Sequence, residues 1–168
     1  MNLKTLHKIS YGLYIIAAHK GNEINAQIAN TVFQITSKPP TVAVSINKEN
    51  YTHEFITAGR SFVVNVLDRE IEMVFIGRFG FKCGRDIDKF DSVKYRLSAL
   101  GNPILEENSV AFMEVRVDKD VDLGTHTLFI GEVVDADILN DGEPLTYAHY
   151  HLVKKGKAPK AAPTYIEE

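Results

Sequence analysis

Asn22 to Thr52 reads NEINAQIANTVFQITSKPPTVAVSINKENYT, and this stretch decides the fold. It predicts a long strand or a pair of strands over 24–36 and another strand over 41–47. Pro39 and Pro40 separate them, because proline cannot donate to a strand ladder. Along the later strand successive side chains point to opposite faces. One face is therefore apolar, and the other is small and polar, which suits a flat polar ligand: Thr41, Ala43, Ser45 and Asn47.

The remainder of the chain predicts more strands and two short helices. Asn50 or Thr52 can cap a helix that runs to about Ala58, and Asp68 can cap another that runs to Ile76. Glycines at 59 and 77 end them. Further strands are expected over 13–19, 61–67, 109–117 and 125–139, with a short turn over 1–10 and a loop over 78–91. This pattern predicts a closed antiparallel barrel with helices packed outside.

Composition narrows the class of protein. A chain of 168 residues, with 45% hydrophobic and 24% charged residues, is typical of one soluble globular domain. Its net charge of -3 argues against a nucleic-acid partner. The one cysteine, Cys83, excludes an internal disulfide and fits a reducing cytoplasm. Tyr11 and Gly12 dilute the apolar run near the N-terminus, so we expect neither export nor a membrane span.

An ordered set of motifs resembles the flavin reductase domain family of FMN-binding split barrels, close to the flavoredoxins. It is also similar to the flavin half of high-molecular-weight rubredoxins. The resemblance covers nearly the whole chain, and these residues carry it: YGLYII (11–16), NAQIANT (25–31), KPPTVAVSINK (38–48), YTHEFI (51–56), GRDIDKF (84–90), HTLFIGEV (126–133) and LTYAHYH (145–151).

The resemblance implies a mainly β protein with short helices, an antiparallel FMN-binding split β-barrel over 1–152. Residues 153–168 are then an extended tail that packs on the domain or on the partner of a homodimer. The implied activity is transfer of electrons from NADH or NADPH, through a bound flavin, to free flavin or a redox protein. FMN is favoured over FAD. The implied cofactor-binding residues are Asn25, Gln27, Ala29, Asn30, Thr31, Ser45, Ile46, Asn47, Thr52, Gly84, Lys89 and His126.

His126 is the implied catalytic residue, beside the redox face of the flavin. Many relatives read Gly-Asp-His here, whereas this chain reads Gly124-Thr125-His126, so the acidic neighbour is missing, which weakens a role of His126 as an acid. A purely structural histidine is the competing interpretation. Lys89 is implied as a ligand of the flavin phosphate or ring. The competing interpretation is a solvated loop in which Lys89 pairs with nearby aspartates. Thr52 is either a phosphate ligand or only a helix cap.

Several other interpretations stay open. The polar face of the strands can be an ordinary solvated surface, and Cys83 has no assigned role. His149 and His151 can form a metal pair on one strand face, but a third ligand is missing. Tyr147 and Tyr150 are expected on a partner subunit near the flavin. No Gly-x-Gly-x-x-Gly motif is present, so a Rossmann site is not expected. The alternative functions are a non-enzymatic FMN electron carrier of flavoredoxin type and a pyridoxamine-phosphate-oxidase-like enzyme.

Overall fold

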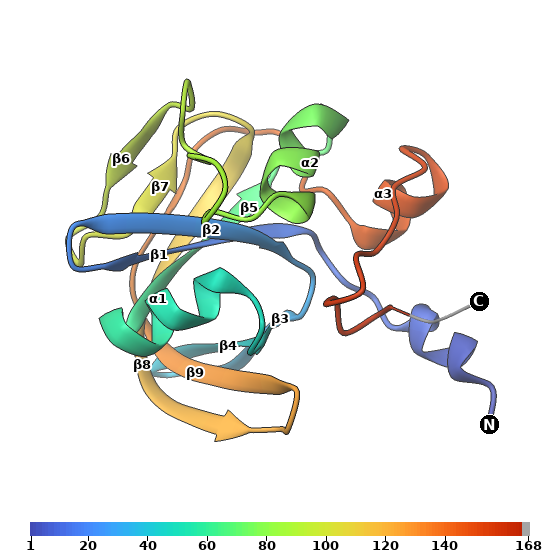
Figure 1. The fold of residues 1–168 in the computed structure, drawn as a ribbon, viewed down its shortest axis with the longest axis horizontal. Coiled ribbons are helices and arrows are strands. Elements are labelled where there is room, and N and C mark those ends of the chain that lie inside the picture. The colour runs from blue at the N-terminus through green and yellow to red at the C-terminus, as the bar shows by residue number, and fades with distance from the viewer. Residues whose placement is uncertain (166–168) are drawn as a thin grey trace.

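A computed structural model describes residues 1–165. Its elements follow one another along the chain (Figure 1) as η1 (Leu3–Lys8), β1 (Tyr14–Lys20), β2 (Glu23–Ala29), β3 (Val32–Ser37), β4 (Pro40–Asn47), α1 (Tyr51–Gly59), β5 (Ser61–Leu67), α2 (Met73–Phe81), β6 (Tyr95–Leu97), β7 (Pro103–Leu105), β8 (Ser109–Asp122), β9 (His126–Ile138) and α3 (Tyr147–Leu152).

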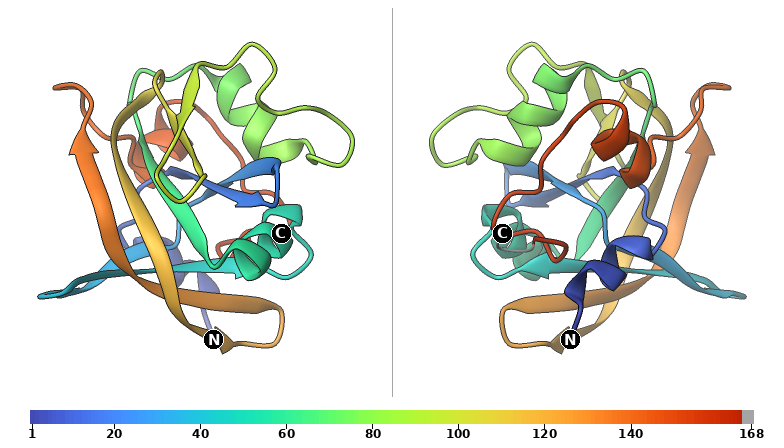
Figure 2. Two further views of the ribbon diagram at one scale, coloured as in Figure 1. Left: turned by 90° about the vertical axis from the view of Figure 1, so that its left-hand side faces the viewer. Right: turned by 90° about the vertical axis from the view of Figure 1, so that its right-hand side faces the viewer.

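Seven strands form one antiparallel sheet in the order β2-β1-β5-β8-β9-β4-β3. The side views in Figure 2 show this sheet curling round on itself, with the long β8–β9 hairpin along one side. Its two edge strands, β2 and β3, are consecutive in the chain and are joined only through Asn30 and Thr31. The barrel is therefore split between them, as the family resemblance implied, whereas the strand pattern alone predicted a closed barrel.

Two hydrophobic clusters lie on opposite faces of the sheet. The alternation predicted for β4 is confirmed, because Val42, Val44 and Ile46 all belong to the cluster that fills the barrel. Phe55 and Ile56 of α1 join that cluster, so α1 closes the mouth of the barrel between β2 and β4. The other cluster lies under α2. Of the two helices predicted from the sequence, α2 therefore packs outside the barrel as expected, and α1 does not.

The second helix lies further along the chain than the sequence predicted. It begins after Glu72 at Met73, and Gly77 lies inside it instead of ending it. The carboxylate of Asp68 does not cap this helix: its Oδ1 accepts the backbone N–H of Glu70 at 2.8 Å, within a turn. The chain at Asp68 also bridges to Pro144. This long-range pairing holds 68–71 out of the helix.

A buried amide ties two strands of the barrel, β1 and β5, to the separate strand β7. Asn65 of β5 has no exposed surface. Its Nδ2 donates to the carbonyls of Ile15 at 3.3 Å and Pro103 at 3.4 Å, and its Oδ1 accepts from the N–H of Leu105 at 2.8 Å. These bonds attach the small β6–β7 hairpin, which the sequence had not indicated, to the barrel wall.

Candidate functional site

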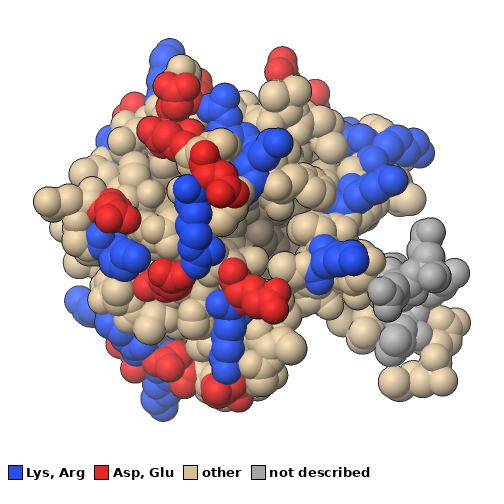
Figure 3. Space-filling view, viewed as in Figure 1, with Lys and Arg blue, Asp and Glu red and all other residues tan. Residues whose placement is uncertain are grey.

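A cavity of about 330 Å³ opens where the barrel is split. Figure 3 shows the corresponding hollow at the centre of one face, below α2 and beside the C-terminal segment. Its volume falls in the range of small-molecule pockets. The walls come from β2, the end of β4, the first turn of α1, the end of α2, α3 and residues 157–164, which we call the strap.

Most of the residues proposed from the sequence meet in this cavity. Both strands contribute their polar faces, and the loop after α2 contributes two more residues. The predicted residues that line it are Asn25, Gln27, Ala29, Asn30, Ser45, Asn47, Thr52, Gly84 and Lys89. Their convergence from four separate segments agrees with a ligand site, although the role of each residue stays a prediction.

Asn25, Thr52 and Gly84 form one corner of the pocket. Asn25 and Thr52 are buried, and the Asn25 Nδ2 donates to the Thr52 hydroxyl at 2.9 Å. Thr52 therefore anchors a pocket side chain and does not cap α1. A Cβ on Gly84 would lie 2.1 Å from the Asn25 Oδ1, so only glycine lets the loop approach this closely. The corner is thus fixed before any ligand arrives.

Gln27 presents an acceptor without a partner. Its Oε1 is buried and makes no hydrogen bond within the described residues, while its Nε2 makes a long bond of 3.4 Å to the carbonyl of Ile28. A buried unpaired acceptor is costly unless a ligand satisfies it. The N–H of a polar heterocycle would do so.

The N-terminus of α1 lies at the corner formed by Asn25, Thr52 and Gly84. The side chain of Asn50 makes no cap hydrogen bond, contrary to one sequence expectation. The first N–H groups of the helix, at Tyr51 and Thr52, thus lack a capping side chain and carry the positive end of the helix dipole. Because both residues line the pocket, this end of it favours an anionic group such as a phosphate.

Lys89 is held differently from the sequence expectation. Its ammonium is buried and donates to the backbone carbonyls of Ala26 at 2.8 Å and Phe79 at 3.1 Å, and it pairs with no aspartate of the described chain. Burial lowers the pKa of Lys89 to about 8. Two of its three donors are thus used to tie α2 to β2. The third is left for a ligand, so the implied phosphate or ring contact stays a prediction.

Three predicted residues do not line the cavity. Ile46 points into the barrel core. Thr31 acts through its neighbour, because its hydroxyl donates to the Asn30 Oδ1 at 3.0 Å and fixes that amide. His126 lies opposite Asn47 in the β4–β9 register. Its Nδ1 lies 2.9 Å from the Thr125 hydroxyl, and its buried Nε2 has no partner among the described residues.

Some residues that line the pocket were not predicted from the sequence, and others were expected elsewhere. Tyr147 and Tyr150, expected on a partner subunit, line the pocket of their own chain, as do residues 79–83 of α2 and the following turn. Burial raises the pKa of both phenols, so they stay protonated. Thr146 was the residue from which helix α3 could have been predicted, because its hydroxyl accepts the N–H of His149 at 3.1 Å and caps that helix.

Residues 147–152 form that helix and not a strand, so the idea of a histidine pair on one strand face was wrong. His149 and His151 are two positions apart in α3 and do not share a helix face. Among residues 1–165, no group of three or more metal-ligating side chains is close enough to hold an ion. None of the helices described there is long and apolar enough to cross a membrane.

The split barrel and its pocket have the shape and polarity that suit a flat polar ligand carrying an anionic group. The chain belongs to the flavin reductase like domain family, which matches residues 6–156. It is 57% identical over 165 residues to a high molecular weight rubredoxin of Moorella thermoacetica, covering 98% of this chain and 72% of that protein.

Two further relatives agree with this family. The chain is 50% identical over 167 residues to a ferric-chelate reductase (NAD(P)H) of Archaeoglobus fulgidus, covering 99% of both proteins. Among solved structures, the flavin reductase HpaC complexed with NADP+ superposes with a TM-score of 0.74 at 25% identity. That match covers 86% of this chain and 90% of HpaC. Both the family resemblance and the split-barrel fold expected from the sequence are confirmed.

Proposed function

We propose that this chain is a flavin-dependent oxidoreductase that binds FMN in the pocket and passes electrons from NADH or NADPH to a downstream acceptor. The observation that carries the proposal is the unpartnered Oε1 of Gln27, a residue that lines the same cavity as the uncapped N-terminus of α1. Such a cavity offers an acceptor for a ring N–H and a positive end for a phosphate. Flavin mononucleotide carries both groups.

The proposed residue roles follow from the geometry. Gln27 accepts from the ring, Ser45 and Asn47 line the ring from β4, and the start of α1 holds the phosphate. Gly84 leaves room for Asn25, which in turn positions Thr52. When bound, flavin supplies the redox chemistry by accepting hydride from a reduced nicotinamide and releasing electrons to an acceptor.

His126 has a positioning role in this proposal. It does not line the cavity, so a direct catalytic contact requires a ligand that extends past Asn47 along the β4–β9 register. The unpartnered Nε2 keeps such a contact available. Loss of the imidazole should slow reduction by nicotinamide more than it weakens flavin binding.

A homodimer is part of the proposal, with a different surface from the one expected. Tyr150 is buried in the core and cannot anchor a partner. Phe33 and Ile35 of the edge strand β3 are instead 49% and 44% exposed. Phe33 pairs with Ala43, two residues before Ser45, so it lies on the same sheet face as the pocket. A second copy packed there would flank the ligand.

A non-enzymatic electron carrier is the second candidate, favoured by the 57% identity to a protein named as a rubredoxin. The two candidates differ in whether reduced nicotinamide reacts with the bound flavin. The test is to load the protein with FMN, follow binding by calorimetry, and titrate it anaerobically with NADH and then NADPH. Bleaching of the visible flavin absorption supports the oxidoreductase. Binding without bleaching supports the carrier, and no binding refutes both.

A further inference from the structure

The strap, residues 157–164, covers part of the pocket with the chain's own backbone. In Figure 1 this segment leaves α3 and runs back past the split of the barrel, and the right-hand view of Figure 2 shows it in front of the sheet. It follows the core of the domain in the sequence, yet it contacts Asn30, just after β2, and Asn47, at the end of β4. It is therefore placed to control entry.

The strap contacts the same amides that the proposed ligand would use. The Asn30 Nδ2 donates to the Thr164 hydroxyl at 3.1 Å, and the Tyr147 hydroxyl shares a 2.6 Å hydrogen bond with the same oxygen. Asn47 donates through Nδ2 to the carbonyl of Ala161 at 3.3 Å. Thr164 is only 8% exposed. The distal end of the strap is thus docked where a ligand would lie.

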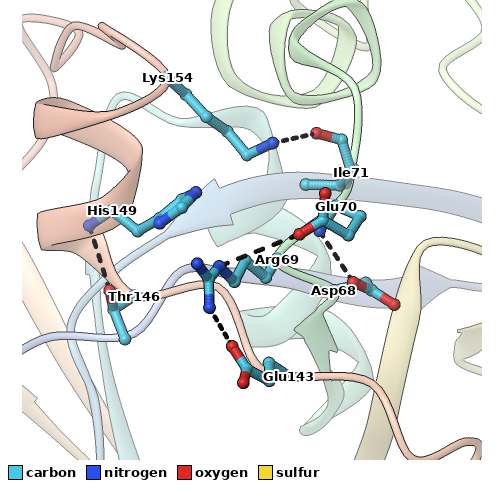
Figure 4. A network of polar contacts seen from close by, with 8 residues as sticks. All are labelled: Asp68, Arg69, Glu70, Ile71, Glu143, Thr146, His149 and Lys154. Atoms are coloured by element: carbon cyan, nitrogen blue, oxygen red, sulfur yellow. Dashed lines mark hydrogen bonds and ion pairs between the residues drawn. The ribbon is translucent and has the colours of Figure 1, made fainter.

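The near end of the strap is fixed firmly to the domain. Figure 4 shows Lys154, whose Nζ donates to the carbonyl of Ile71 at 2.9 Å. The N–H of Gly156 donates to the carbonyl of Tyr150, and the Tyr150 hydroxyl donates to the carbonyl of Lys157, both at 2.9 Å. A fixed root beside a distal end that lies across the pocket is the arrangement of a hinged flap.

The sequence of the strap fits a segment that can release. Between Lys157 and Thr164 it reads APKAAP, in which every side chain except that of Lys160 is small or cyclic and buries little apolar surface. It belongs to no strand of the described chain. Thr164 and the carbonyl of Ala161 hold its distal end to the pocket walls, so a change at Thr164 acts directly on this attachment.

We propose that the strap is a latch that competes with flavin for the amides of Asn30 and Asn47 and swings out beyond Lys157 when flavin enters. This inference rests on the proposed function, because flavin is the ligand that displaces it. A latch of this kind lowers apparent affinity by the fraction of molecules in which it is open. Weakening the latch should therefore tighten flavin binding, whereas weakening a true ligand contact would loosen it.

The first test uses Thr164→Val, which removes the hydroxyl and keeps the volume. The matched control is Thr57→Val on the exposed surface of α1. Stopped-flow mixing of flavin-free full-length protein with FMN, followed by flavin fluorescence, gives the association rate. Thr164→Val removes two hydrogen bonds, so we expect it to speed association and to lower the dissociation constant by at least about three- to tenfold, the usual effect of losing one. A weaker complex in Thr164→Val, or equal rates in both variants, would overturn the latch.

The second test needs no variant. Brief trypsin treatment, read by mass spectrometry, reports exposure of the bonds after Lys157 and Lys160 relative to the bond after Lys94, an exposed residue before β6. Faster cleavage of the strap with FMN supports release. Protection by FMN would overturn the latch and leave the proposed function standing. Calorimetry that shows no FMN binding would overturn both, so the two failures are distinguishable.

Discussion

The pH dependence of folding should reveal the buried ammonium of Lys89. Burial lowers its pKa from the usual 10.5 to about 8. The unfolded chain therefore binds more protons than the folded chain between pH 8 and 10.5, and the free energy of unfolding must rise with pH across that window. At about 1.4 kcal/mol per pKa unit, the full rise from this residue is about 3 kcal/mol.

The hydrogen bonds do not cancel this gain. A neutral amine still has two N–H groups, enough for the carbonyls of Ala26 and Phe79. The comparison is with Lys89→Met, which keeps a long apolar side chain but cannot titrate. This substitution leaves both carbonyls without their donor, so the stability of the variant should be lower throughout, by about 1–3 kcal/mol per unsatisfied group. Only the slope with pH decides the question.

Urea unfolding of both proteins at about pH 7.5, 9 and 10.5 measures that slope. Cys83 also lies in the electrostatic surroundings of Lys89, so both proteins should carry Cys83→Ser to remove that interaction. The protein with Lys89 should gain about 3 kcal/mol relative to Lys89→Met between the lowest and highest pH. Two parallel profiles would show that the ammonium is well solvated, and the structural account of Lys89 would be wrong.

Three further substitutions test other parts of the structure. Gly84→Ala should weaken FMN binding at least about tenfold by calorimetry, because its Cβ would displace Asn25, whereas Gly77→Ala in α2, with open space around it, should bind normally. Asn65→Ala should lower the free energy of unfolding by about 3 kcal/mol in urea, since it leaves buried backbone groups unpaired; a loss under about 1 kcal/mol would contradict this. Phe33→Asp should convert the proposed dimer to a monomer in light scattering, and an unchanged mass would exclude β3 from the interface.

The strands could be predicted from the sequence because the alternation of side chains along a strand is a local property of the chain. The run from Ser61 to Leu67 is almost continuously apolar, and β5 has those bounds. In β4 the alternation identified both the core face and the pocket face. Both features follow from the two-residue period of a strand, which any correct fold must satisfy. The same period accounts for Ser45 and Asn47 on the pocket side of β4.

Long-range contacts explain what could not be predicted. Asp68 has the sequence of a helix cap, but pairing with Pro144 holds it in a turn, and α2 starts only at Met73. The strap offered no local signal, because its composition is that of a solvated tail and its position is set by contacts with Asn30 and Asn47. The strap is brought to the pocket by contacts with residues far away in the sequence. No motif within 157–164 indicates this position.

The pocket walls reach from β2 near the N-terminus to Thr164 near the C-terminus, so the cavity exists only once nearly the whole chain has folded. A ligand seated there binds the folded protein and not the unfolded chain. At about one hundred times its dissociation constant, such a ligand adds about 2.7 kcal/mol to stability. The cellular supply of flavin would then set how long each molecule survives proteolysis, and added flavin should rescue variants weakened far from the pocket.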